Sequence, residues 1–493
     1  MEKRTASNDA VTNPSSKRSA IDHNDQGHND QAAVDDELSS INDLLQDEET
    51  SQKQTWQIGK RVKRLLESHE NLPISKQLDA YFLWGTALTR LASLNEDPTL
   101  ADAAADKFEQ MMQLSNGGAD EDVVDAALGP VGFSLWGSSL LIVATETQSR
   151  EVLDRALAKF QRAVKVDGGT TFETRFQFAK ALKEGGDLVT FLEQEEDKKC
   201  VKKSSYYKRA LQICRRLEEI YQVESQKQEE HVEESEDDDK VTVQDFAEAK
   251  LLEAVLQGLL EDSSSVDDFH RTIALYQEAS ALNRGSAEAL TEMTNYLAAR
   301  CLKRATLGAK FIVHEWTKLF DNLEAEYKSL LLDAGFDLQE CHNICHRKDT
   351  HNQEGLDEEE VEEQVPHLLN TLGKGLAAFV RSFPHLVDGA GQQKKKQKRK
   401  RHEVSGNARF THAVEILRSA HHFHDKLGSY YLACLYASPA FEDEVQCRTW
   451  LETADSYGAL EDEFDVQEFT TMHDKAWFKR LAQPQVQIDE IDG

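Results

Sequence analysis

The chain has 493 residues, of which 57 are Lys or Arg and 89 are Asp or Glu, so that its formal net charge is -32. Apolar residues make up 39%, below the share of about 45–50% that is usual in globular domains. This balance disfavours a protein that binds duplex DNA through its overall charge, because phosphate binding needs a positive field. The 8 Pro and 25 Gly are too few for a sandwich or barrel with many turns. We expect an all-α, acidic chain of about three domains or one repeat array.

The cysteines and the apolar runs indicate the cellular compartment of the protein. Seven cysteines lie far apart, and their odd number disfavours a disulfide framework. No apolar run follows Met1, so we expect no secretory signal and reduced thiols in the nucleus or cytosol. The longest apolar stretch, Phe133–Ala144, is shorter than the roughly 20 residues that a membrane span requires. We therefore expect a buried helix there and no membrane contact.

Charge is concentrated in a few segments, and these set the predicted boundaries. Blocks of like charge repel themselves and stay extended, so we place them on tails and linkers. The sequence thus predicts a disordered tail (1–35), acidic loops (224–240 and 351–364), a basic linker (389–406) and a C-terminal tail (484–493). Between them we expect N-terminal helical repeats (36–223), middle helical repeats (241–350), a helix (365–388) and a C-terminal repeat with its cap (407–483).

Two stretches of the chain resemble each other at a fixed offset of 52 residues. YFLWGTAL at 81–88 matches FSLWGSSL at 133–140. A glycine inside a helix costs about 1 kcal/mol relative to Ala, so its recurrence predicts that the paired helix approaches too closely for a Cβ. The alanines would face the glycines from the second helix, and the phenylalanines would fill the groove beside them. The packing positions of the repeat are Trp84, Gly85, Ala104 and Phe108 in the first copy and Trp136, Gly137, Ala156 and Phe160 in the second.

This pattern resembles the tetratricopeptide repeat, in which pairs of helices stack into an α-solenoid. The 19 residues from glycine to small residue exceed that family's usual gap, so we expect an extended segment between the helices. Arg175–Leu182 is predicted as a further first helix that ends at a glycine pair. Phe246–Leu260 and Asp268–Leu282 are predicted as another helix pair, and residues 463–481 as a closing helix.

Catalytic and metal-binding motifs are scarce in the sequence. The sequence contains no P-loop, G-x-G-x-x-G, H-E-x-x-H or G-x-S-x-G motif. The group Cys341-His342-Asn343-Ile344-Cys345-His346 holds ligand-type residues in two i, i+4 pairs, but either pair needs two more ligands to hold zinc. The interpretation we favour is a helix C-terminus with the cysteines inward and the histidines near its negative end. His421–His424 is similarly interpreted as a helix face. We expect no metal, cofactor or catalytic residue.

The basic run in the linker 389–406 has three interpretations: a nuclear-localisation signal, a nucleic-acid contact or a solvated linker. No aromatic residue interleaves with it, so stacking on single strands is not supported. Flanking glycines make the run accessible to a receptor, and we favour nuclear import and a nuclear location, with shuttling to the cytoplasm as an option. The candidate signal consists of Lys394, Lys395, Lys396, Lys398, Arg399, Lys400 and Arg401.

The layout of the chain resembles the fungal enhancer-of-translation-termination family. The shared features are a short start that contains Lys and Arg, an acidic DDELSSINDLL segment at 35–45, a repeat array with acidic insertions and no catalytic motif. The resemblance implies a nuclear adaptor built of tetratricopeptide-like repeats. It also implies a role in translation termination and, in related members, in oxygen- or stress-responsive transcription. It supplies no catalytic residues.

The function we expect is therefore that of a non-enzymatic adaptor or scaffold. Stacked helix pairs form a concave groove that takes a partner peptide or helix. Side chains of first helices would line it, with Thr86, Arg90, Ser138, Lys180 and Asn295 as candidates. Two other functions stay open. One is an acidic chaperone that captures basic nuclear or ribosomal proteins through the acidic loops. The other is an enzyme, metal-dependent through the Cys341–His346 group, with its site in 303–388.

Overall fold

The computed structural model describes residues 23–47, 50–69, 72–116, 121–195, 203–230, 241–303, 313–346, 363–384, 408–460 and 464–482. Within these ranges the regular structure is helical and no strand occurs, which confirms the predicted all-α class. The chain divides into two compact units, residues 1–203 and residues 204–493.

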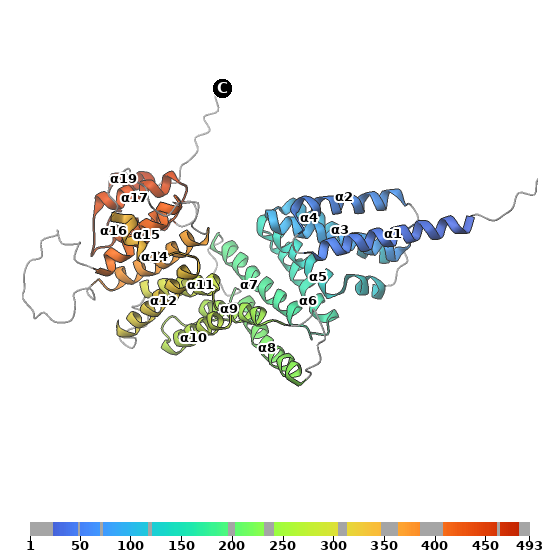
Figure 1. Cartoon of the computed structure of the whole chain (residues 1–493), viewed down its shortest axis with the longest axis horizontal. Coiled ribbons are helices and arrows are strands. Elements are labelled where there is room, and N and C mark those ends of the chain that lie inside the picture. Colours follow the sequence, from blue (N-terminus) through green and yellow to red (C-terminus); the bar gives the residue numbers. More distant parts are fainter. Residues whose placement is uncertain are drawn as a thin grey trace, which may run out of the picture. The chain divides into compact units, whose positions relative to one another are not determined.

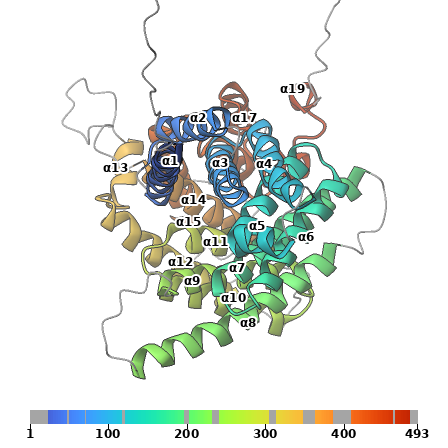
Figure 2. The ribbon, with the colours of Figure 1, turned by 90° about the vertical axis from the view of Figure 1, so that its right-hand side faces the viewer.

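In the described part of the N-terminal unit the chain forms seven helices, which Figure 1 labels. They are α1 (His23–Gln46), α2 (Gln52–Ser68), α3 (Ile74–Asn95), α4 (Pro98–Asn116), α5 (Glu121–Glu146), α6 (Arg150–Val166) and α7 (Phe172–Glu195). Consecutive helices joined by short connections pack against each other, and α1 to α4 lie side by side in both views (Figures 1 and 2). Side chains cap two of the turns, since Ser51 forms a capping box at α2 and Ser149 caps α6. The unit is thus a row of helical hairpins.

Helix α5 is longer and more apolar than the sequence predicted. Among the described residues, Val123–Glu146 has the length and the mean hydropathy, 1.6, of a helix that could cross a membrane. The prediction that this region is too short to do so was therefore wrong. In the structure α5 packs against α3, α4, α6 and α7, and it bends at Gly129, whose φ of 58° suits glycine. Trp136 and Leu140 on α5 are buried, and 44% of its apolar segment is buried inside the structure.

The described part of the C-terminal unit contains more helices, most of them shorter, although α8 is the longest of all. They are α8 (Lys203–Glu230), α9 (Val243–Leu260), α10 (Val266–Leu282), α11 (Ala287–Leu302), α12 (Val313–Asp333), α13 (Glu340–His346), α14 (Gln364–Ser382), α15 (Ala408–Phe423), α16 (Ser429–Ala437), α17 (Glu444–Ser456), the 3₁₀ helix η5 (Val466–Phe469) and α19 (Ala476–Leu481). Helix α14 is central, because it packs against α11, α12, α15 and α16 and most of its side chains are buried. One apolar core runs from α9 to α19.

Several predicted boundaries were wrong. Helix α1 begins at His23, inside the predicted tail, and α8 continues to Glu230, inside the first predicted acidic loop. Helix α7 runs through the glycine pair at 185–186, because Gly185 packs closely on Leu153 of α6 and its conformation stays helical. Residues 463–481 contain η5 and the short α19 in place of one closing helix. The sequence thus predicted the presence of these helices better than it predicted the residues at which they begin and end.

Candidate functional site

Two hairpins of the N-terminal unit share one packing device. In the α3–α4 pair the ring of Phe108 lies on Gly85, and in the α5–α6 pair the ring of Phe160 lies on Gly137. A Cβ on either glycine would approach the ring to 2.7 Å, which no packed structure accommodates without a shift. A phenylalanine ring, and not the small residue of the second helix, is thus what requires glycine at this point.

The neighbouring positions repeat as well. The Nζ of Lys107 lies 4.6 Å from the ring centroid of Trp84, and the Nζ of Lys159 lies 3.3 Å from that of Trp136. These are cation–π contacts at matching places in the two hairpins. The alanines of the predicted packing set, Ala104 and Ala156, are fully buried on the second helices. Matching residues therefore make matching contacts at the 52-residue offset.

A cavity of about 460 Å³ lies in the N-terminal unit along α3, α5 and α7, and α5 packs against both of the other two helices. A buried hydrogen bond of 2.9 Å between the hydroxyls of Thr89 and Ser139 joins α3 to α5. Most lining residues belong to α3, α5 and α7 or, as Glu96 does, cap one of these helices. The exceptions are Phe160 of α6 and Pro98, which begins α4. The other lining residues are Ala92, Ser93, Glu96, Ser138, Leu141, Ile142, Thr145, Glu146, Gln177, Lys180, Ala181 and Glu184. We call this cavity the α3–α5–α7 groove.

The charge of the groove is mainly negative. Glu96, Glu146 and Glu184 line it and are exposed, against the single cation of Lys180. Glu96 caps the C-terminus of α3 and Glu146 is the last residue of α5. A helix C-terminus carries a partial negative charge, so a carboxylate there opposes helix stability. Helix formation therefore does not explain these two glutamates, and the groove gains a negative end from both side chains and backbone.

The predicted groove residues fall in different places. Ser138 and Lys180 line the α3–α5–α7 groove, and Thr86 does not. The guanidinium of Arg90 donates hydrogen bonds to the carbonyls of Leu45, Asp47 and Thr50, so it fixes the connection between α1 and α2. Asn295 is half-buried on α11 of the C-terminal unit and does not line this groove either.

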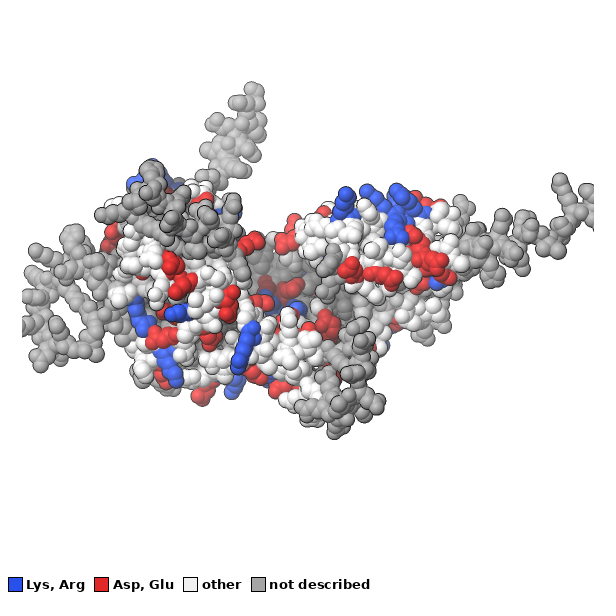
Figure 3. All heavy atoms as spheres, viewed as in Figure 1, with Lys and Arg blue, Asp and Glu red and all other residues white. Residues whose placement is uncertain are grey.

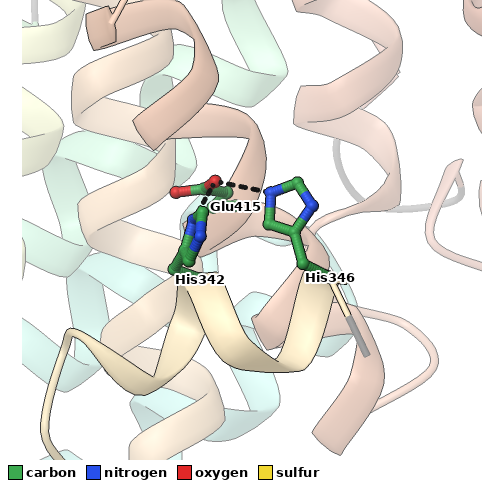
Figure 4. Close-up of side chains that lie close together, drawn as sticks. All are labelled: His342, His346 and Glu415. Carbon is green, nitrogen blue, oxygen red and sulfur yellow. Dashed lines mark hydrogen bonds and ion pairs between the residues drawn. The ribbon is translucent and has the colours of Figure 1, made fainter. Parts of the chain in front are cut away.

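The C-terminal unit brings His342 and His346 of α13 to one carboxylate of α15 (Figure 4). The Nδ1 of His342 lies 2.8 Å from the Oε1 of Glu415, and the Nε2 of His346 lies 3.1 Å from the same oxygen. Both imidazoles are exposed, whereas the Glu415 side chain is only 12% exposed. Cys341 is buried, and the thiol of Cys345 donates to the Glu415 carbonyl at 3.4 Å. The cysteines face the protein interior and the histidines converge on Glu415.

Sequence reasoning missed Glu415, which is 69 residues from His346 along the chain. Its only signal was a charge inside the apolar run AVEIL at 413–417, where a buried carboxylate needs a partner. The second histidine group behaves as a helix face: the His421 ring packs edge-on against Trp450, with centroids 5.5 Å apart. The seven residues of the predicted localisation signal, 394–396 and 398–401, lie outside the described residues, as do 231–240 and 351–362 of the acidic loops.

The surface charge is not uniformly acidic. Lys and Arg side chains gather along the edge of the N-terminal unit where α2 lies (Figure 3). The exposed face of α2 carries Lys53, Lys60, Lys63 and Arg64 beside Trp56, which is 46% exposed. The opposite face of α2 packs into the core. The negative charge of the groove is therefore a local property, set by the glutamates named above.

Comparison with models of known protein families and with curated proteins gives no match to this chain.

Proposed function

We propose that this protein is a non-enzymatic adaptor of tetratricopeptide-like repeats that binds a partner segment in the α3–α5–α7 groove. The observation that carries the proposal is the groove itself, which is lined mainly by α3, α5 and α7, with α5 packed against both of the others. Stacked hairpins commonly use the concave side of such an array for binding. The repeated Gly–Phe contacts of Gly85 with Phe108 and of Gly137 with Phe160 support the repeat.

The lining suggests the chemistry of the partner. Leu141, Ile142 and Ala181 offer apolar surface, and the three glutamates offer negative charge at its border. A short helix or extended peptide with an apolar side chain next to Lys or Arg would satisfy both. Charge complementarity of this kind raises the association rate and selects the partner more than it raises affinity.

Peptide display against the purified full-length chain tests this function. We expect enrichment of peptides that carry Lys or Arg beside apolar residues, and loss of this enrichment in the variant E96K/E146K/E184K. The matched control, D102K/D106K/D154K, reverses three exposed acids on the second helices α4 and α6 and should keep the binding. Enrichment that is unchanged by groove reversal, or that both variants lose equally, would contradict a role for the groove.

The proposed location is the nucleus, on the strength of the basic run at 394–401. Replacement of Lys395, Lys396, Lys398 and Arg399 by Ala should move a fluorescent fusion to the cytoplasm. A nuclear signal that stays unchanged in this variant would argue against the import role.

The proposed process is translation termination, with transcriptional regulation as a further role, in line with the family resemblance. In cells that lack the protein, a stop-codon reporter should show altered readthrough, and wild-type protein should restore it. If E96K/E146K/E184K restores readthrough as well as wild type does, the groove is not the part that acts in this process.

A second function, capture of basic proteins by an acidic chaperone, is supported by the net charge of -32 and the acidic runs. Salt distinguishes the two functions, because exposed charges more than about 10 Å apart are screened at 0.1 M salt. Partners lost between 0.1 and 0.5 M salt would favour charge capture, whereas partners retained at 0.5 M salt would favour groove recognition.

A further inference from the structure

We propose that His342, His346 and Glu415 form a binding site for a zinc ion in the C-terminal unit. The three ligand atoms, two imidazole nitrogens and one carboxylate oxygen, lie within 4.8 Å of one another (Figure 4). This donor set suits zinc, which binds imidazole nitrogen and carboxylate oxygen at roughly 2.0–2.2 Å. The site goes beyond the adaptor function and does not depend on it.

The local structure builds this arrangement. Histidines four residues apart lie on the same face of a helix, so His342 and His346 present their rings together, with centroids 4.3 Å apart. Glu415 reaches them from α15, which packs directly against α13. Ser419 and Cys345 both bond to the Glu415 carbonyl and hold that turn of α15 in place. Two of the ligands thus share one rigid turn and the third comes from a well-packed helix.

The two distances to Glu415 require only a small rearrangement. Ligand atoms around a tetrahedral zinc lie about 3.3 Å apart, given bonds of roughly 2.0–2.1 Å. The two nitrogens are 2.8 and 3.1 Å from the Glu415 oxygen, so each must move away from it by a few tenths of an ångström to admit the ion. The two nitrogens lie within 4.8 Å of each other, and rotation of the imidazole side chains sets this third spacing. Because both histidine side chains are more than half exposed, they can turn and an ion can enter from solvent.

The surroundings indicate a structural or regulatory ion and not a hydrolytic one. The H-E-x-x-H motif of zinc peptidases places its general base directly after the first histidine. Asn343 occupies that position here, and an amide cannot take up a proton. Water would complete the coordination of the ion. The ion would hold α13, which ends at His346, against α15.

Zinc binding to the full-length chain, stripped with EDTA and titrated with ZnCl₂ in a calorimeter, tests the site. We expect about one equivalent bound by wild type, and less than a tenth of an equivalent by H342A/H346A. E415Q should bind at least tenfold more weakly, because it loses the charged ligand. The control H314A removes an exposed histidine of α12 and should bind as wild type does.

A second measurement covers the case in which a variant folds poorly. The single variant H342A changes a side chain that is 65% exposed, so its fold should persist by circular dichroism while zinc affinity drops. Zinc should raise the melting temperature of wild type and of H314A but not that of H342A/H346A, and MgCl₂ should raise none of them. Less than a tenth of an equivalent in wild type, or full binding by H342A/H346A, would overturn the proposal.

Discussion

The two units pack their helices in different ways. The N-terminal unit repeats one contact, a phenylalanine on a glycine, in successive hairpins of long helices. The C-terminal unit packs α11, α12, α15 and α16 around α14 and holds a buried ion pair, Arg300 with Glu261 at 2.9 Å. The repeated contact joins residues of one hairpin, whereas the C-terminal unit brings residues about 70 apart in the chain together in the cluster of His342, His346 and Glu415.

The largest expected effect is on the repeated contact. Phe160→Ala removes a ring that is 2% exposed, and we expect a loss of about 3–5 kcal/mol in the free energy of unfolding of the N-terminal unit. Phe108→Ala should cost about the same, because its ring fills the matching place. Urea denaturation followed by tryptophan fluorescence measures both. Very unequal losses in the two variants would break the claim that the hairpins are equivalent.

Zinc should act on one unit alone. At a free concentration of 100 times its dissociation constant, a ligand stabilises the state that binds it by about 2.7 kcal/mol. Hydrogen exchange should therefore slow in peptides from α13 and α15 when ZnCl₂ is added, and stay unchanged in peptides from α3 to α6. Slowing that is equal in the two sets would point to a different binding place.

The glycines provide the next largest effect. Gly85→Ala and Gly137→Ala push a methyl group into a ring and should cost about 1–3 kcal/mol. Gly59→Ala on α2 is the matched control, since its Cβ would meet Trp84 at an ordinary 3.5 Å and alanine favours a helix by about 1 kcal/mol. Thermal melts should thus move in opposite directions. A stabilising Gly137→Ala would show that the ring has room to move.

The smallest effect concerns the pH dependence of the C-terminal unit. A hydrogen bond from His412 lowers the pKa of Glu324 below its ordinary value of 4.5. Because the folded-state pKa lies below the unfolded one, this group stabilises the protein above pH 4.5, and the contribution is lost as the pH falls through the lowered value. Glu324→Gln should cost less than about 1 kcal/mol at pH 7, since both side chains are a third exposed. Urea melts of wild type and variant should converge at low pH; a constant difference would contradict the linkage.

Contacts within a hairpin could be predicted from the sequence, and longer-range contacts could not, for a physical reason. Contacts within a hairpin join residues about 20 apart, as Gly85 and Phe108 do. Both residues recur 52 positions later, so the contact was visible as a pattern in the sequence. The pair α9 and α10 was likewise predicted from periodicity, within a few residues at each start. Helix ends were predicted less well, because a glycine can mark a helix end or a close contact, and Gly185 in α7 is the second kind.

The candidate sites also could be predicted only where no contact between distant residues was involved. Of the five residues predicted to line a groove, Ser138 and Lys180 line the α3–α5–α7 groove, and their part in binding stays a prediction. The role of Arg90 could not be predicted, since its partners are carbonyls 40 to 45 residues earlier in the chain. Glu415 could not be paired with His342 either, because 73 residues separate them and no periodicity links α13 to α15.

The most direct test of the adaptor function is site-specific photo-crosslinking in cells. A benzophenone amino acid at Thr145, exposed at the border of the α3–α5–α7 groove, is compared with one at Ala158, exposed on α6 outside it. We predict a discrete crosslinked product from position 145 that is absent at position 158 and is lost in E96K/E184K. No product from position 145, or the same products from both positions, would contradict a binding groove on the first helices.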